Sequence, residues 1–115
     1  MFKFETLKVW HKSVEFADTM ISIADSLPQK YQYSFGDQLR RAALSVPNNI
    51  AEASGRRAGK EAKNLFNISK GSVYEGVNIL VILSKRKLVN WEIFNREQVY
   101  FLAEEISKML TALIK

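Results

Sequence analysis

The sequence has no cysteine, one histidine, two prolines and five glycines among 115 residues. Without cysteine the chain forms neither a disulfide framework nor a zinc site with thiolate ligands, which suits a reducing compartment. We therefore expect a cytoplasmic protein that is stabilised by a hydrophobic core. A hydrophobic content of 47% and this length are enough for one such core, so the sequence predicts a single domain over residues 1–115.

Long apolar runs are absent as well. The longest one, Ile79 to Leu83, is far shorter than the about 20 residues that a membrane-spanning helix needs. The N-terminal residues lack a basic stretch followed by an apolar one, so they do not resemble a secretory signal. We expect no membrane partner. The formal net charge of +5 permits an anionic partner without requiring one.

Apolar residues recur every three or four positions in four segments, which predicts helices over about 6–27, 35–54, 60–86 and 91–114. Pro28, Gly55 and Asn90 mark the breaks between these helices. Strand-like alternation and internal repeats are missing. Helices that are joined by short connections pack as antiparallel neighbours. The predicted fold is therefore an all-α, antiparallel up-down-up-down four-helix bundle.

The first predicted helix carries two neighbouring apolar rows. One row includes Trp10, Val14 and Ile21, and the other includes Phe16 and Met20. The resulting apolar arc is wider than a single packing seam requires. Such a helix either lies between two neighbours of its own bundle or also faces another subunit, and the sequence leaves both interpretations open.

Proline, serine and glycine give further local expectations. Pro47 interrupts the second helix, and because the apolar spacing resumes in phase after it, we expect a kinked but continuous helix. Ser34 is expected to cap the start of this helix, and Gly55 to end it in the left-handed conformation. Gly71 and Gly76 lie inside the third helix, where the close approach of another backbone would explain a glycine.

Polar residues lie at core-like spacing in the segment QLRRAALSVPNNIAEASGRR, residues 38–57. If the second and third helices are antiparallel neighbours, Glu75 falls opposite Arg40 or Arg41, so either arginine could form an ion pair with it. The simplest interpretation is a buried or half-buried network that sets the register of the bundle. The alternative is a ligand or active site between these helices. The residues of this predicted polar network are Gln38, Arg40, Arg41, Ser45, Asn48, Asn49, Glu52, Ser72 and Glu75.

Four strings together resemble a known family: Phe4…Leu7-x-Val9-Trp10, Leu27-Pro28, QLRRAALSVPNNIAEASGR, and GSVYE at residues 71–75. The family consists of small four-helix-bundle proteins encoded by intervening sequences inside bacterial 23S ribosomal RNA genes. The resemblance covers nearly the whole chain. The family usually has glycine directly after NIAE, where this chain has Ala53-Ser54-Gly55, so we expect a local shift of the turn.

The resemblance implies that the bundle assembles into a ring-like homopentamer. The chain also resembles the accessory protein of diversity-generating retroelements. That protein shares the fold and has a reverse transcriptase and nucleic acid as its partners. The ribosomal label of the family reflects the location of its genes. The resemblance therefore bears on fold and assembly rather than on biochemical activity.

Signatures of catalysis and of cofactor binding are weak. A di-metal carboxylate centre in a helical bundle needs Glu-x-x-His pairs, and the only histidine, His11, has no glutamate three positions before it. No arginine is followed by the histidine that helical ribonucleases of the HEPN type carry, and no nucleotide-binding glycine loop is present. We expect neither a cofactor nor enzymatic activity. A distant alternative is a hydrolase that uses Glu52 and Glu75 as acid and base.

The best candidate for external recognition is a basic turn between the second and third helices, formed by Arg56, Arg57, Lys60 and Lys63. Cations at a helix N-terminus oppose the helix dipole, so they are better tolerated where anions bind. A solvated turn that Glu61 partly neutralises is the other interpretation. The sequence thus predicts a non-enzymatic, oligomeric interaction module that binds RNA, DNA or a nucleic-acid-handling protein. The alternative is a self-assembling structural protein with no nucleic-acid role.

Overall fold

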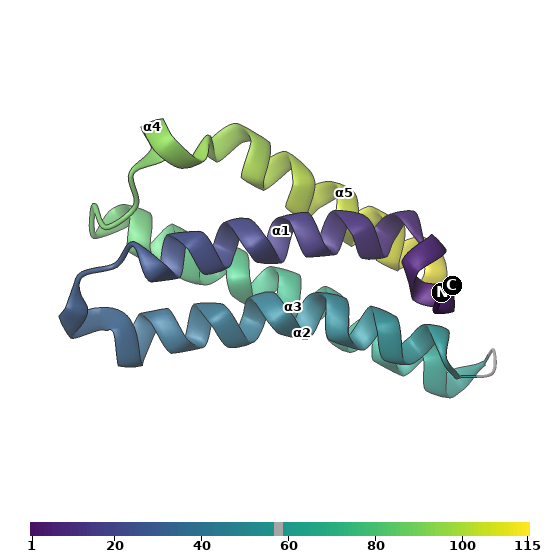
Figure 1. The fold of residues 1–115 in the computed structure, drawn as a ribbon. Coiled ribbons are helices and arrows are strands. Elements are labelled where there is room, and N and C mark those ends of the chain that lie inside the picture. The colour runs from purple at the N-terminus through teal and green to yellow at the C-terminus, as the bar shows by residue number, and fades with distance from the viewer. Residues whose placement is uncertain (57–58) are drawn as a thin grey trace.

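The computed structural model describes residues 1–56 and 59–115. The long helices are α1 (Lys8–Asp25), α2 (Asp37–Ser54), α3 (Lys60–Lys85) and α5 (Arg96–Ile114), and one short helix, α4 (Trp91–Phe94), precedes α5. Figure 1 shows that successive long helices run in opposite directions and that both termini lie at the same end. The described residues contain no strand. The predicted all-α helical bundle is confirmed.

The core lies between the four long helices and takes one face from each. Its largest fully buried side chains include Phe16, Met20 and Ile23 of α1, Leu39, Val46 and Ile50 of α2, Leu80 and Leu83 of α3, and Ile106 and Leu110 of α5. Burying one such side chain stabilises the fold by about 1.5–3 kcal/mol. Around the core the helices follow the order α1, α2, α3, α5, each packed against the next, and α5 packs against α1.

Gly76 of α3 leaves room for the Met20 side chain of α1 in the core. A Cβ atom at this position would lie 2.5 Å from the Cε atom of Met20, which is fully buried. The approaching group is a side chain, so the predicted close approach of another backbone is wrong for Gly76. It is also wrong for Gly71 among the described residues, because a Cβ atom there would meet no atom of a neighbouring element within 4 Å.

The helix α2 continues through Pro47, as the spacing predicted. Pro47 itself is buried, and the expected kink stays a prediction. On α3, the fully buried Ser69 donates a hydrogen bond to the carbonyl oxygen of Val46 at 2.8 Å. This bond ties α3 to α2 at the residue before the proline.

Both ends of α2 differ from the sequence prediction. Ser34 does not cap the helix, because one wide π-type turn, Gln32–Gly36, runs directly into α2 and leaves no free helix end at Ser34. The Ser34 hydroxyl donates instead to the carbonyl of Tyr31 at 3.3 Å. Gly55 has a φ of −85°, so the expected left-handed ending is also wrong. Its amide bonds to the carbonyl of Glu52 at 3.1 Å, which closes the helix with a tight right-handed turn.

The single helix expected over residues 91–114 is divided at Asn95. This residue has a φ of 54°, in the left-handed region, which asparagine tolerates better than most residues. Its side chain accepts a hydrogen bond from the amide of Gln98 at 3.3 Å and so caps α5. Asn90 caps α4 in the same way, through the amide of Glu92 at 3.1 Å. A short α4 therefore precedes α5 in place of one continuous helix.

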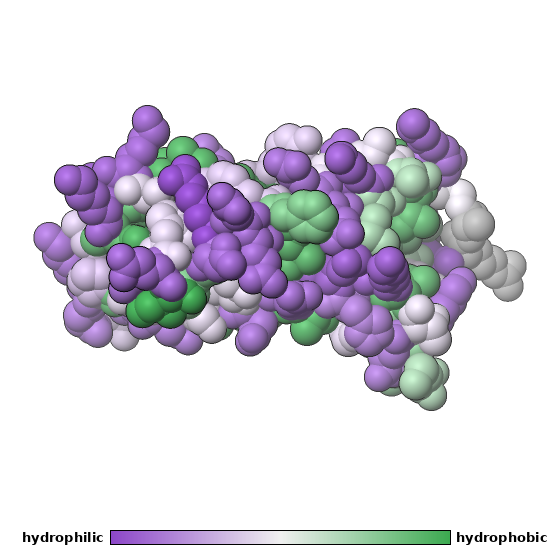
Figure 2. All heavy atoms as spheres, turned by 90° about the horizontal axis from the view of Figure 1, so that it is seen from above, coloured by the Kyte–Doolittle hydropathy of each residue, from purple (hydrophilic) through white to green (hydrophobic). Residues whose placement is uncertain are grey.

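The molecule is elongated, with principal extents of 43 × 26 × 25 Å. Figure 2 looks onto it from above and shows apolar side chains in separate patches among hydrophilic ones. None of the described helices combines the length and the apolar character that crossing a bilayer requires.

Candidate functional site

Three residues of the predicted polar network form one hydrogen-bonded chain between α2 and α3. The Asn49 side-chain amide donates to the Ser45 hydroxyl at 3.0 Å, and the Ser45 and Ser72 hydroxyl oxygens lie 2.7 Å apart. Ser72 also donates to the carbonyl of Ile68 at 3.1 Å. If Ser45 donates to Ser72, each hydroxyl donates once and accepts once. The chain is then satisfied without any charged group.

Five other residues of that network are exposed: Gln38, Arg41, Asn48, Glu52 and Glu75. Within the described part of the chain, neither Arg41 nor Glu75 forms an ion pair. The row of α2 that faces α3 contains Ala42 and Ser45, and Arg41 lies about 100° further round the helix, toward solvent. The predicted Arg41–Glu75 pair and the buried network around it are therefore wrong.

Arg40 contacts the end of α1 instead of Glu75. Its guanidinium donates to the carboxylate of Asp25 at 2.9 and 3.1 Å and to that of Asp37 at 3.2 Å. It also bonds to Gln32, whose amide donates to three carbonyls near the end of α1, at 3.0, 3.4 and 2.8 Å. The last carbonyls of a helix lack partners within it, so this cluster closes α1 and joins it to α2. The sequence pattern did not predict this cluster, although Asp37 lies three residues before Arg40.

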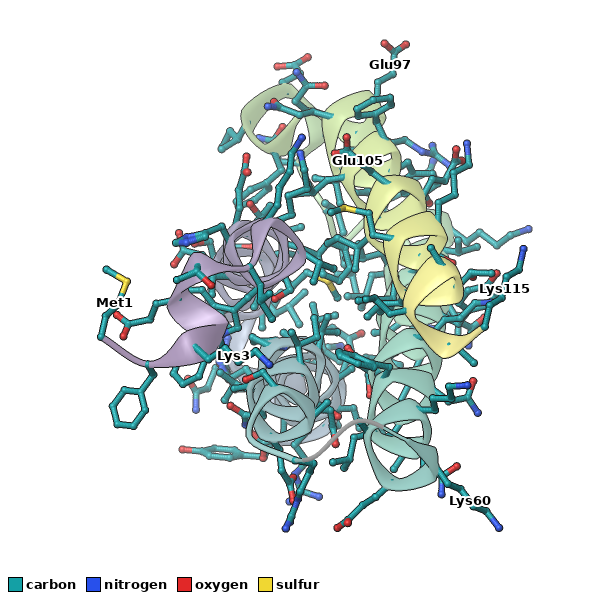
Figure 3. The ribbon with its side chains drawn as sticks, turned by 90° about the vertical axis from the view of Figure 1, so that its right-hand side faces the viewer. Met1, Lys3, Lys60, Glu97, Glu105 and Lys115 are labelled. Atoms are coloured by element: carbon teal, nitrogen blue, oxygen red, sulfur yellow. The ribbon has the colours of Figure 1, made fainter. Side chains whose placement is uncertain are left out.

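The basic turn is partly neutralised. Arg56 is paired with Glu52 at 3.0 Å and with Glu61 at 3.4 Å, and the hydrogen bond to Glu52 raises the pKa of Arg56. Arg57 lies outside the described residues. Lys60 and Lys63 are exposed beside a shallow hollow of about 450 Å³ between the start of α3 and the end of α5. Figure 3 shows Lys60 pointing away from the bundle.

An apolar groove of about 360 Å³ lies on the outer side of α1 and α2; we call it the α1–α2 groove. Its apolar lining includes Trp10, Val14, Ile21, Leu44, Pro47 and Ala51. Val14 and Leu44 remain 39% and 48% exposed. Trp10, Val14 and Ile21 form one of the two apolar rows predicted for α1, which we call the outer row. The other row, with Phe16 and Met20, lies in the core. The bundle of a single chain therefore covers the outer row only in part.

A second hollow of about 370 Å³, the α3–α5 groove, lies on another side of the bundle. Its apolar lining includes Val73, Tyr74 and Val77 of α3 and Ala103 of α5. Tyr74 is 63% exposed, and the nearby α5 residue Phe101 is 66% exposed. Figure 3 looks along the bundle and shows α3 and α5 on the side away from α1 and α2, in agreement with the packing order. The two grooves therefore face in different directions.

Among the described residues, the side chains considered for catalysis and metal binding lie apart. No three His, Asp or Glu side chains in residues 1–56 and 59–115 are grouped so as to hold a metal ion. His11 is exposed, and its Nε2 atom hydrogen-bonds to the carbonyl of Glu5. Glu52 is bonded to Arg56, and Glu75 is exposed on α3, so neither carboxylate lies in an enclosed site.

The fold is shared with a protein of known structure. The crystal structure of a protein of unknown function from the S23 ribosomal protein family of Bacteroides thetaiotaomicron superposes with a TM-score of 0.81 and 26% sequence identity, covering 93% of this chain and 98% of that one. No curated protein matches the chain. The family described as 23S rRNA-intervening sequence protein matches residues 5–112, which include all of α1 to α4 and most of α5. The chain therefore belongs to the 23S rRNA-intervening sequence protein family.

Proposed function

We propose that this protein is a non-enzymatic interaction module that assembles into a ring-like homopentamer and engages nucleic acid or a nucleic-acid-handling protein. The observation that carries the assembly is the pair of apolar grooves on different sides of one bundle. Large exposed apolar patches are uncommon on monomeric proteins and mark interaction sites. The occupant that we propose for each groove is a second copy of the chain.

The two grooves differ in their residues, so contact between them is heterologous. The α1–α2 groove of one subunit then meets the α3–α5 groove of the next, and every added subunit leaves one groove of each kind free. Such an arrangement closes into a ring when the rotation between successive subunits divides a full turn, and it otherwise continues as an open filament. The number of five rests on the resemblance to the family.

Gly71 gives separate support for a partner against α3. It lies inside the helix, it is exposed, and a Cβ atom there would touch no neighbouring element among the described residues. A glycine inside a helix costs about 1 kcal/mol relative to alanine. Its exposed neighbours on α3 include Ile68, which is 53% exposed, and Tyr74. Close approach of a second subunit at this surface explains the glycine.

The nucleic-acid part of the proposal rests on the basic turn and on the likeness to the accessory protein of diversity-generating retroelements. Because Arg56 is already paired, Lys60 and Lys63 carry the free positive charge among the described residues of the turn. Two phosphate contacts give a salt slope of only about −1.8 on duplex DNA. A ring would multiply these contacts through effective concentration. Binding and assembly are therefore linked.

Light scattering on three single variants tests the assembly. The wild type should have five times the chain mass of 13.2 kDa, whereas Leu44→Lys in the α1–α2 groove and Tyr74→Lys in the α3–α5 groove should both lower the mass. The matched control is Ile93→Lys on α4, which changes a residue that is 70% exposed and outside both grooves. A wild type with the mass of a monomer at micromolar concentration contradicts the ring.

Retention of RNA and DNA at two salt concentrations tests the partner. We expect the wild type to retain nucleic acid more strongly at low salt, and Lys60→Glu/Lys63→Glu to retain less of it. Equal retention by both proteins at both salt concentrations removes the basic turn from the proposal. An assembled ring that retains no nucleic acid favours the alternative, a self-assembling structural protein.

A further inference from the structure

A second group of cations lies at the end of the bundle away from the basic turn. Figure 1 shows that the α1–α2 and α3–α4 connections share this end, whereas both termini lie at the other. Lys30 comes from the first connection, and Lys85, Arg86 and Lys87 come from the end of α3 and the residues after it. All four are exposed, and none forms an ion pair within the part of the chain that the structure describes.

Aromatic rings contact two of these cations, Lys30 and Arg86, and the contact of Arg86 with Tyr31 spans 55 residues of sequence. Arg86 donates a hydrogen bond to the Tyr31 hydroxyl at 3.3 Å, and its Cζ atom lies 5.8 and 6.0 Å from the ring centres of Tyr31 and Phe35. The Lys30 ammonium lies 5.0 Å from the Tyr31 ring centre. The two rings are 5.7 Å apart. The guanidinium is therefore positioned before any partner arrives.

The four cations set up a positive field at this end, and none of them pairs with the carboxylates of the adjoining helix ends. Asp25 and Asp37, from the adjoining ends of α1 and α2, are both bonded to Arg40. Tyr31 responds to the field: its hydrogen bond to Arg86, with the nearby ammonium of Lys30, lowers the pKa of the phenol from the usual 10.0. The two cations thus stabilise the phenolate form of Tyr31. The same charges would attract a phosphate group.

Lys87 occupies a strained backbone position. Its φ is 60°, and the bonds from its amide to Ser84 at 3.0 Å and from the Leu88 amide to Leu83 at 2.9 Å form a Schellman ending for α3. Glycine or asparagine is usual at this left-handed position. The helix dipole explains why a cation is favourable here, but it explains neither the strain nor the contact between Arg86 and Tyr31. Strain of this kind is often kept at functional sites.

We propose that this aromatic–basic end, formed by Lys30, Tyr31, Phe35 and residues 85–87, binds single-stranded nucleic acid. The three lysines contact phosphates, and an unpaired base stacks on the guanidinium of Arg86 beside the two rings. Sequence-tolerant binding of single strands combines these two elements, a cationic track and a flat stacking surface. The inference rests on the partner class of the proposed function, and it adds a second site and a preference for unpaired bases.

Fluorescence anisotropy with a labelled oligothymidylate of about 12 nucleotides tests this site, since single-strand sites span roughly 4–16 nucleotides. Lys87→Gln should reduce the salt slope by about 0.7, the value for one phosphate contact on a single strand. Arg86→Lys keeps the charge but loses the flat guanidinium, so it should weaken binding by roughly fivefold or more with little change in slope. The control is Lys8→Gln, which removes an exposed charge outside both basic regions and should leave the affinity unchanged.

The outcomes separate this inference from the proposed function. Binding that depends on Lys60 and Lys63 but not on Arg86 or Lys87 overturns the aromatic–basic end and leaves the basic turn in place. Equal affinity for polyglutamate of the same charge, with no effect of Arg86→Lys, means a general polyanion surface and also overturns the inference. A wild type that binds no oligonucleotide overturns this inference and the direct nucleic-acid binding of the proposed function, and leaves the assembly to the light-scattering test. A matched melting temperature for each variant confirms that the fold is intact.

Discussion

At the scale of single residues, two adjacent arginines of α2 have different environments. Arg40 bonds to Asp25, Asp37 and Gln32 and thereby connects α1, the π-type turn and α2. Arg41 is exposed, and it forms no ion pair with any residue that the structure describes. One position along a helix rotates a side chain by about 100°, which moves it from a neighbouring helix to solvent.

Replacing each arginine by alanine separates these roles. Arg40→Ala should lower the free energy of unfolding by about 1–2 kcal/mol, because it removes charge-assisted hydrogen bonds that are only partly exposed to water. Arg41→Ala should change it by less than about 0.5 kcal/mol, as expected for a surface substitution without partners. Urea denaturation measures both values. A larger loss for Arg41→Ala contradicts the assignment.

Tyr31 gives a pH dependence of known sign. Its pKa is lowered below 10.0 in the fold, mainly by the hydrogen bond from Arg86. An acid with a depressed pKa stabilises the folded state above the pKa of the unfolded chain, and this contribution is lost as the pH falls through the folded-state value.

Absorbance titration of the phenol, assigned with Tyr31→Phe, should show ionisation below pH 10.0, and Arg86→Gln should move the midpoint back toward it. An unchanged midpoint in Arg86→Gln excludes Arg86 as the main cause.

At the scale of helices, α3 carries two glycines that serve different contacts. Gly76 faces the buried Met20 of α1, and Gly71 faces solvent in the single chain. The same residue type is therefore explained inside the protomer at one position and outside it at the other. At another position, Asn95 separates the short α4 from the long α5 by its left-handed backbone conformation.

The variants Gly76→Ala and Gly71→Ala should change the free energy of unfolding of the dissociated chain in opposite directions. Both are measured in the Leu44→Lys chain, which is expected not to assemble. Gly76→Ala should destabilise it by about 1 kcal/mol, because Met20 must move within a packed core. Gly71→Ala should stabilise it by up to about 1 kcal/mol through helix propensity. In the otherwise wild-type chain, Gly71→Ala should also weaken assembly. Thermal unfolding and light scattering measure these effects, and unaltered assembly contradicts an interface at Gly71.

At the scale of the whole molecule, apolar and cationic features occupy different parts of an elongated bundle. The two apolar grooves lie along the long helices, between α1 and α2 and between α3 and α5. The α2–α3 connection with the basic turn and the aromatic–basic end lie at opposite ends of the bundle (Figure 1). Subunits that join through their sides leave their ends free. A ring built in this way presents several copies of each cationic end on its two rims.

Assembly should therefore raise the affinity for nucleic acid. For an oligonucleotide long enough to span two subunits, Leu44→Lys should bind at least about 100-fold more weakly than wild type, because dissociation removes the gain from effective concentration. Ile93→Lys should retain wild-type affinity. Anisotropy titrations at one salt concentration give the comparison. Equal affinities for the assembled and dissociated forms contradict a multivalent ring.

Much of the helical architecture follows from the sequence alone. The apolar spacing around Phe16, Leu39 and Ile106 identifies the faces that enter the core, because the period of an α-helix depends only on local geometry. The same spacing shows that α2 continues past Pro47. Asn90 is a local capping signal that the structure uses.

Only the tertiary structure decides which polar residues meet. The spacing of Arg40 and Arg41 does not specify how α2 is rotated against its neighbours, so the partner of each depends on packing. The contact between Arg86 and Tyr31 joins residues that are 55 positions apart, and no local pattern encodes it. The sequence therefore determines the helices and their buried faces, whereas the packing of the helices determines the grooves, the free charges and the candidate binding surfaces.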